Sequence, residues 1–152
     1  MSMYTPLLED EELEKLEADL DMCDRVFVYG TLKKGYCNNV LLGASTLLTN
    51  TTTEEPFVLG DIGFPYAFNK SIVPEKYAKL LFPVKGEVFK IDSLVTFINL
   101  DGLEGYPRHY NRRIIRTISG LTAWMYMQDD WSVAESCDAC NLKEGVWIWS
   151  GR

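Results

Sequence analysis

The sequence predicts an α+β domain built on a small, curved, barrel-like β-sheet with short helices. Short β-branched or aromatic runs recur along the 152 residues and are separated by irregular loops, whereas only two or three segments have a helical pattern. Strands and helices do not alternate regularly, which argues against a doubly wound parallel sheet. The chain contains no internal repeat and no low-complexity linker, and its length suits one domain.

Composition argues against two classes of partner. The chain is 47% hydrophobic and 24% charged, which is the balance of a soluble packed domain. Its net charge of −7 repels phosphate backbones, so we expect no nucleic-acid partner. No apolar run approaches the ~20 residues of a membrane helix, and the acidic N-terminus is unlike a signal peptide. We therefore expect no membrane association and a cytoplasmic location, while the oligomeric state is left open.

The first 24 residues predict an acidic N-terminal helical extension. Residues 8–22 are rich in Glu and Asp and place Leu13, Leu16 and Leu20 at helical spacing. We expect this leucine stripe to pack on the body of the protein, although a partner-binding helix has the same pattern. The remaining residues, 25–152, are predicted to form one domain, whose tail from about residue 129 has no clear pattern.

The first half of this domain predicts four short strands. Residues 25–29 form a β-branched and aromatic run that ends at Gly30, and a loop and a short helical piece at 38–42 follow it. Further strands are predicted at 45–53, 57–59 and 64–68. Pro74 and Pro83 then bracket a loop or a single turn of helix.

The second half predicts one helix between strands. Residues 84–91 alternate as a strand does, with Gly86 marking a bulge or a close backbone approach. Asp92 or Ser93 is expected to cap a helix that runs to about Leu103 and ends at a Gly-x-Pro break. The last predicted strands are 111–118, 121–127 and 146–149, the final one being alternatively an aromatic flap over a pocket.

The cysteines do not predict a metal or redox centre. Only Cys137 and Cys140 form a C-x-x-C, and His109 is the only histidine, so the tetrahedral donor set of a zinc site is lacking. No βαβ pattern surrounds Cys137, which argues against a thioredoxin-like redox motif. We therefore expect no metal, no other cofactor, and four reduced thiols.

Two segments carry residues suited to chemistry. YGTLKKG at 29–35 runs from a strand into a glycine-flanked turn, which exposes consecutive backbone N–H groups suited to a carboxylate. Its glycines could equally serve only a tight turn. LDGLEGYPRHYNRR at 100–113 places Glu104 at the end of an apolar helix, where aromatic neighbours would desolvate it and raise its pKa toward neutrality. A solvated glutamate at a helix end is the plainer alternative.

Together with VKGEVF at 84–89, these two motifs resemble the γ-glutamylcyclotransferase-like family in order and spacing, most closely its γ-glutamylamine cyclotransferase branch. The resemblance covers roughly residues 26–127. It implies a small mixed sheet that is closed toward a barrel and flanked by short helices. The acidic leader and the tail that contains Cys and Trp have no counterpart in it.

The resemblance implies that Glu104 is the catalytic residue of a metal-independent cyclotransferase. It also implies a set of substrate-binding residues, namely Tyr29, Gly30, Thr31 and Leu32 through their backbone, Tyr110 and Arg112 as a Y-x-R element, and the pocket-lining Tyr126. The substrate would be a small γ-glutamyl amine or γ-glutamyl amino acid. The products would be 5-oxoproline and the released amine.

Cyclisation requires only substrate positioning and one proton-transfer group from the protein. The substrate's own α-amine attacks the side-chain carbonyl, so positioning alone can lower the barrier by roughly 7–11 kcal/mol. One carboxylate of raised pKa can take a proton from the attacking amine and pass it to the leaving amine. Glu87 and Asp101 compete with Glu104, but only Glu104 joins an apolar helix to a Gly–aromatic–Pro turn. Two other functions stay open, namely a catalytically silent module that binds a metabolite or protein, and a hydrolase of another amide.

Overall fold

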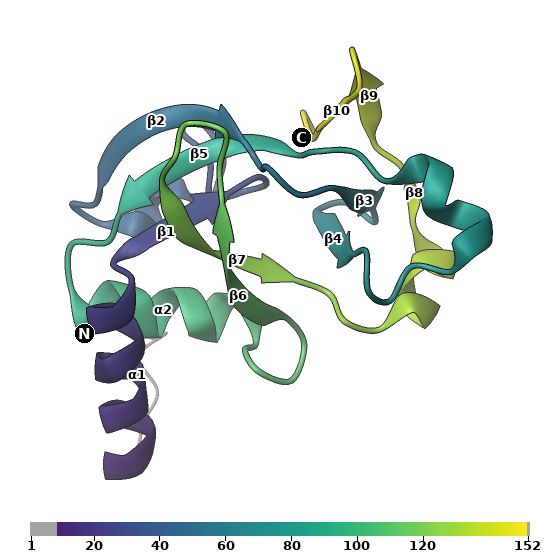
Figure 1. Ribbon diagram of the computed structural model, residues 1–152. Helices are drawn as coiled ribbons and strands as arrows, with labels where there is room; N and C mark the ends of the chain where they lie inside the picture. The colour runs from purple at the N-terminus through teal and green to yellow at the C-terminus, as the bar shows by residue number, and fades with distance from the viewer. Residues whose placement is uncertain (1–8, 152) are drawn as a thin grey trace.

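The computed structural model describes residues 9–151 and contains a five-stranded mixed sheet. Its strands are β1 (Arg25–Val28), β2 (Thr46–Thr52), β5 (Lys85–Lys90), β6 (Asn111–Arg116) and β7 (Thr122–Met127). Their order in the sheet is β2-β5-β1-β7-β6 (Figure 1). The central pair, β1 and β7, is parallel, and the other neighbouring pairs are antiparallel. The α+β class and the mixed sheet are as predicted.

The sheet curls until its two edge strands meet. Beyond the ends of β2 and β6, Thr53 pairs with Thr117 in an antiparallel bridge. The N–H of Ile118 also donates to the carbonyl of Thr52 at 2.9 Å. Joining the edges in this way satisfies backbone groups that an open sheet would leave unpaired. The predicted barrel-like closure is therefore confirmed.

A smaller sheet and the C-terminal tail cover one end of this barrel. The smaller sheet has the order β4-β3-β8 and consists of β3 (Phe57–Asp61), β4 (Pro65–Asn69) and β8 (Asp138–Ala139). A separate hairpin pairs β9 (Asn141–Lys143) with β10 (Val146–Ile148), so the last predicted strand is present. Trp147 on β10 is buried, and its Nε1 donates to the Phe57 carbonyl at 2.9 Å. The tail therefore packs on the body of the protein.

The N-terminal helix α1 (Asp10–Met22) packs against the body as predicted. Leu16 is buried, and Leu13 and Leu20 are partly buried against the same hydrophobic cluster. Residue 8, where the predicted helix starts, lies outside the described residues. In Figure 1, α1 lies beside the second helix, α2 (Leu94–Glu104), and the two are in contact. Within residues 9–151, no helix is long and apolar enough to cross a bilayer.

Helix α2 has clear start and stop signals. The Ser93 hydroxyl accepts a hydrogen bond from the Thr96 N–H at 3.2 Å and so caps the first turn. The helix ends at Gly105, whose φ of 65° lies in the left-handed region that glycine favours. Glu104 is therefore the last helical residue, one position beyond the predicted end. The short 3-10 segments are η1 (Asn39–Leu42), η2 (Glu75–Leu80) and η3 (Trp131–Ser136).

The hydrophobic core forms two clusters. One contains Phe68, Phe97 and Leu100, and the other contains Phe57 and Met125. The backbones of β1 and β5 come very close together at Gly86. A Cβ at this position would collide with the Val28 carbonyl and the Phe27 ring. Gly86 thus marks a close backbone approach, as its position in a strand predicts.

Candidate active site

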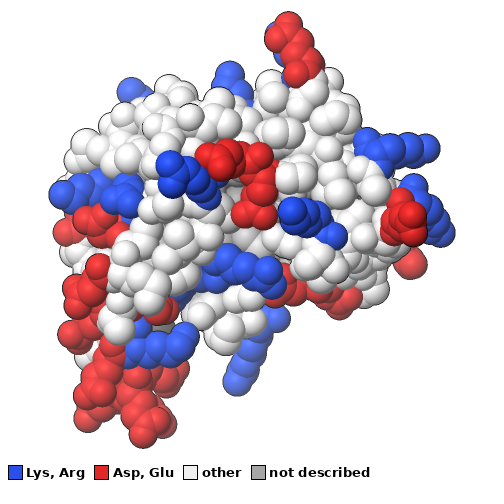
Figure 2. Space-filling view, in the orientation of Figure 1, with Lys and Arg blue, Asp and Glu red and all other residues white. Residues whose placement is uncertain are grey.

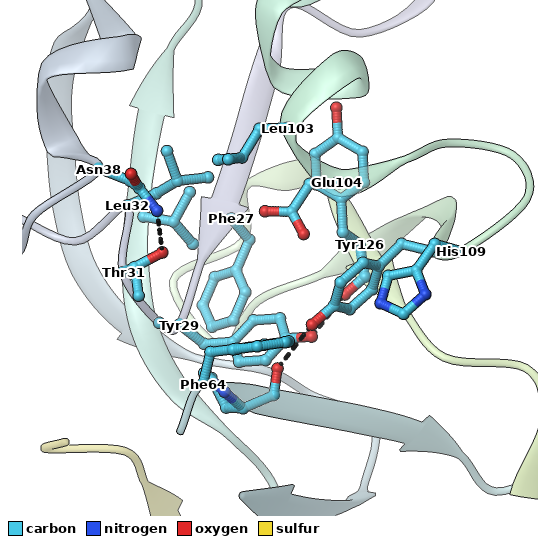
Figure 3. Close-up of a pocket in the computed structure, with 14 residues that line it drawn as sticks. Phe27, Tyr29, Thr31, Leu32, Asn38, Phe64, Leu103, Glu104, His109 and Tyr126 are labelled. Carbon is cyan, nitrogen blue, oxygen red and sulfur yellow. Dashed lines mark hydrogen bonds between the residues drawn. The ribbon is translucent and has the colours of Figure 1, made fainter. Parts of the chain in front are cut away.

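A cavity of about 300 Å³ opens where β1, the turn after it, β4 and the end of α2 meet (Figure 3). The predicted site residues that line it are Tyr29, Gly30, Thr31, Leu32, Glu104, Tyr110 and Tyr126. The remaining lining residues are Phe27, Val28, Asn38, Phe64, Pro65, Leu103 and His109. Two sequence segments more than 70 positions apart therefore meet around one hollow, as the combined motifs imply.

The turn after β1 is held by its own backbone and by Asn38. The Lys33 N–H donates to the Gly30 carbonyl at 3.1 Å, and the Asn38 N–H donates to the Thr31 carbonyl at 3.0 Å. The Asn38 side chain also donates to the Thr31 hydroxyl at 2.9 Å (Figure 3). Within the described residues, the amide N–H groups of Gly30, Thr31 and Leu32 donate none of the turn and loop hydrogen bonds. These three groups therefore have no acceptor among those hydrogen bonds.

Gly30 lies where a larger residue would not fit. A Cβ at this position would lie 2.7 Å from Cγ of Pro65, well inside van der Waals contact. The glycine therefore lets the turn approach β4 closely at the cavity wall. This requirement is steric, because its φ does not lie in the left-handed region.

Glu104 has the environment of a proton-transfer group. Its carboxylate points into the cavity in Figure 3. Burial raises its pKa to about 7, and the negative charge of Asp101, one helical turn earlier, adds to the rise. In the described part of the chain, residues 9–151, no hydrogen-bond donor or cation pairs with this carboxylate. A carboxyl group of this kind exchanges a proton near neutral pH.

The tyrosines around the cavity are structural donors. The Tyr29 hydroxyl donates to the Tyr126 carbonyl at 2.7 Å, and the Tyr110 hydroxyl donates to the Pro65 carbonyl at 2.9 Å. Burial raises the pKa of the Tyr29, Tyr110 and Tyr126 phenols above the ordinary value. They therefore stay protonated and fix the shape of the wall, while their rings contribute apolar surface.

His109 lines the cavity, although sequence reasoning considered it only as a metal ligand. Its Nε2 lies 2.8 Å from the hydroxyl of Tyr66 on β4. The signal in the sequence was its position five residues after Glu104, in the same Tyr- and Arg-rich segment. Phe64 and Pro65 gave no such signal, because only the folded chain brings β4 to Glu104.

Arg112, for which the resemblance implies a substrate contact, is not among the residues that line this cavity. Its side chain is 1% exposed, and it donates from Nε and Nη2 to the two carboxylate oxygens of Asp101 at 2.9 and 3.0 Å. Its Nη1 donates to Asp19 on α1 at 3.0 Å. Tyr110 and Arg112 are two positions apart, but the carboxylates of Asp19 and Asp101 hold the longer side chain outside the cavity.

The other candidate acids and the tail tryptophans also lie outside the cavity. Asp101 accepts hydrogen bonds from Arg112 and from the Tyr126 hydroxyl. Glu87 accepts from the Lys34 N–H at 2.7 Å and so braces the loop behind the turn. Trp147 and Trp149 in the tail belong to the second hydrophobic cluster and are not among the residues that line the cavity.

The cysteines near β3 are in the thiol form. Burial raises the pKa of Cys140 to about 12, and burial also raises that of Cys137. A protonated thiol is a poor nucleophile. Among residues 9–151, no group of three or more His, Cys, Asp or Glu side chains is arranged to hold a metal ion.

Comparison with known proteins gives one consistent result. Residues 26–148 match the family described as "Gamma-glutamyl cyclotransferase, AIG2-like". A Vibrio cholerae protein named "Putative gamma-glutamylcyclotransferase" is 35% identical over 119 residues, which cover 76% of this chain and 94% of that protein. A similarly named protein of Methanocaldococcus jannaschii is 33% identical over 106 residues, 66% of this chain and 81% of that one. The crystal structure of an AIG2-like protein from Mus musculus superposes with a TM-score of 0.54 at 25% identity, over 69% of this chain and 76% of that one.

Proposed function

The chain belongs to the AIG2-like gamma-glutamyl cyclotransferase family, and from this premise we propose that it cyclises a γ-glutamyl amine or γ-glutamyl amino acid to 5-oxoproline. The observation that supports this proposal best is the environment of the Glu104 carboxylate. This carboxylate faces the cavity, has no protein partner within the described residues, and has a pKa that burial raises to about 7. A domain that only binds a ligand has no need to keep an unpaired carboxylate in an apolar wall, because desolvation makes it costly.

The turn after β1 would hold the glutamyl head of the substrate. The free N–H groups of Gly30, Thr31 and Leu32 suit an α-carboxylate, which needs several donors but no cation. Among the described residues, no Lys or Arg lines the cavity, so the backbone is the donor set at hand. With its head held at the turn, the substrate can place its α-amine and its γ-carbonyl between the turn and Glu104.

Ring closure then proceeds by attack of the α-amine nitrogen on the γ-carbonyl carbon. A C–N bond to the α-nitrogen forms, and the C–N bond to the leaving amine breaks. The α-ammonium group loses two protons in all, and the leaving nitrogen gains two, so the reaction needs no external acid or base. Glu104 takes a proton from the attacking nitrogen and delivers one to the departing nitrogen, a role for which a pKa near 7 is well matched.

The test is an assay of the purified protein with a panel of γ-glutamyl amino acids and γ-glutamyl amines. We expect formation of 5-oxoproline, measured by mass spectrometry, with at least one member of the panel. The Glu104→Gln variant is the matched control, because it keeps the shape of the side chain and removes its proton-transfer capacity.

The alternatives give different products. Release of free glutamate without 5-oxoproline would identify a hydrolase and overturn the proposal. Binding of panel members without turnover, measured by calorimetry, would identify a binding module. Both outcomes contradict the cyclotransferase assignment, because cyclisation alone yields the lactam.

A further inference from the structure

A chain of polar contacts connects α1 to the wall of the cavity. Asp19 on α1 accepts a hydrogen bond from Nη1 of Arg112 at 3.0 Å. Arg112 holds both carboxylate oxygens of Asp101 on α2. Asp101 in turn accepts from the hydroxyl of Tyr126, whose ring lines the cavity. The Arg112 side chain thus links α1 to α2, the helix that carries Glu104.

The middle of this chain is almost completely buried. The Arg112 side chain is 1% exposed, and those of Asp19 and Asp101 are 15% and 14% exposed. The guanidinium carbon lies 4.1 Å from the ring centre of Tyr106 and 4.5 Å from that of Trp124. Rings on its faces and carboxylates at its edges leave the guanidinium one orientation. Without Asp19, its Nη1 would face α1 without an acceptor, which is costly in a buried site.

The contacts of α1 bracket Glu104 in the sequence. On one side Asp19 reaches Asp101, three residues before Glu104, through Arg112. On the other side Lys15 donates to the hydroxyl of Tyr106, two residues after Glu104, at 3.3 Å. The last turn of α2 and the segment after it are therefore both held from α1.

Helix α1 is not part of the segment that matches the family. The match covers residues 26–148, and α1 ends at Met22. Figure 2 shows acidic side chains gathered over α1, at the lower left of the molecule. Asp19 differs from those exposed neighbours, because it alone accepts a hydrogen bond from the buried arginine.

We propose that Asp19 is a positioning residue for Glu104, acting through Arg112 and Asp101. Its carboxylate completes the shell of Arg112, and Arg112 fixes Asp101 and the last turn of α2. Asp19 also sets how much of the positive charge of Arg112 is left to offset Asp101. By this inference, helix α1 helps to position the catalytic carboxylate. The proposal rests on the function proposed for Glu104.

The sign of the electrostatic effect follows from the charges. The negative charge of Asp101 favours the protonated form of Glu104. An Asp19→Asn substitution removes one negative charge and leaves Arg112 paired with Asp101 alone. Both changes make the potential at Glu104 less negative, so its pKa falls. The other titratable groups that act on or line the same site are the neutral Tyr29, Tyr66, Tyr110 and Tyr126, and His109.

The experiment compares Asp19→Asn with Glu17→Gln. Glu17 lies on the same helix and is exposed, so both variants lose one negative charge and only the first touches Arg112. The pKa of Glu104 is measured from its side-chain ¹³C-carboxyl NMR shift, which does not depend on activity. We expect Asp19→Asn to lower this pKa by roughly half a pH unit, the scale of one partly screened nearby charge. We expect Glu17→Gln to leave it unchanged.

Kinetics supply the second measurement. In Asp19→Asn, kcat for formation of 5-oxoproline should fall several-fold at neutral pH with little change in KM. Equal Glu104 titration curves in the two variants would overturn the positioning role, whether or not the enzyme is active. Absence of 5-oxoproline with the unaltered protein would instead count against the proposed function, and the NMR titration would still decide the role of Asp19.

Discussion

Two hollows of similar volume, about 300 and 330 Å³, flank the last turn of α2. They differ in whether the carboxylate that lines them has hydrogen-bond partners in the protein. The cavity contains Glu104, which has no protein partner and a pKa of about 7. The second hollow lies under α1 and contains Asp101, which is held by Arg112 and Tyr126. The unpaired acid and the fully paired one are thus only three positions apart on one helix.

The difference shows that partners, more than burial, decide what a buried acid can do. Asp101 has donors aimed at both oxygens, so its charge is stabilised in place and it serves as a structural anchor. Glu104 faces apolar and aromatic side chains, which leave its charged form without support. The first arrangement stabilises the fold, and the second keeps a proton-exchanging group ready at a cost in stability.

The largest effect expected from this comparison is the loss of turnover in Glu104→Gln. If Glu104 is the proton shuttle, kcat should fall by roughly 10²–10⁴-fold, the usual worth of a general acid–base group. KM should change little, because the amide fills the same space. The measurement is steady-state formation of 5-oxoproline, with Glu54→Gln as the control. Glu54 pairs with Arg116 on the surface at 3.2 Å, and its loss should leave kcat unchanged. A Glu104→Gln variant as active as the unaltered protein would end this assignment.

The second effect tests the paired side. Arg112→Met keeps most of the apolar stem but leaves Asp101 without its cation and Asp19 with only the exposed Lys15, at 3.8 Å. We therefore expect a loss of about 3 kcal/mol in the free energy of unfolding. Arg113→Met is the matched control on the next residue. Its guanidinium pairs with Asp129 at 3.5 Å, and both side chains are more than a third exposed, so the loss should stay below about 1 kcal/mol. Urea unfolding measures both variants, and equal losses would contradict the contrast.

Sequence reasoning succeeded where structure is set locally. The strands around 25–29 and 84–91, the helix capped by Ser93 and its end at Gly105 follow from side-chain alternation and from capping residues, which act over a few positions. The position of Glu104 at the helix end could be read in the same way. Its role in a site, however, came from the resemblance of two motifs to a family, because neither motif is specific alone.

Contacts between distant segments could not be predicted. Asp19 and Arg112 are 93 positions apart, and no pattern in either segment names the other. The same holds for Trp147, whose indole N–H is bound by the Phe57 carbonyl 90 positions away. The resemblance implies a substrate contact for Arg112, whereas its side chain is bound to Asp19 and Asp101. A short motif fixes which side chains are near one another in sequence, and packing decides which way they point.

A third effect concerns the stability cost of Glu104. Its pKa in the folded protein is about 7, above its ordinary value of 4.5, so the folded state binds its proton more tightly. The contribution of protonated Glu104 to the free energy of unfolding is fully present below pH 4.5 and is lost as the pH rises through 7. Above that pH the ionised Glu104 should therefore destabilise the fold by about 3 kcal/mol. Glu104→Gln has no such term, so its stability advantage over the unaltered protein should grow between pH 4.5 and pH 8. Parallel urea-derived stability curves for the two proteins across this range would show that Glu104 titrates normally.

The smallest effect sharpens the comparison at the opposite end of the cavity, where the ligand meets backbone. Gly30→Ala would place a Cβ 2.7 Å from the Pro65 ring, so the turn must shift and its N–H groups lose their alignment. We expect KM to rise roughly tenfold, which corresponds to about 1.4 kcal/mol, while kcat changes less. Because the collision is with Cγ and Cδ of the proline ring, Pro65→Ala should relieve it, and the double variant should recover most of the lost affinity. A double variant as impaired as Gly30→Ala alone would show that the glycine is needed for the turn itself. An unchanged KM in the single variant would remove the backbone of this turn from substrate binding, and Glu104 would then need another partner to present the glutamyl head.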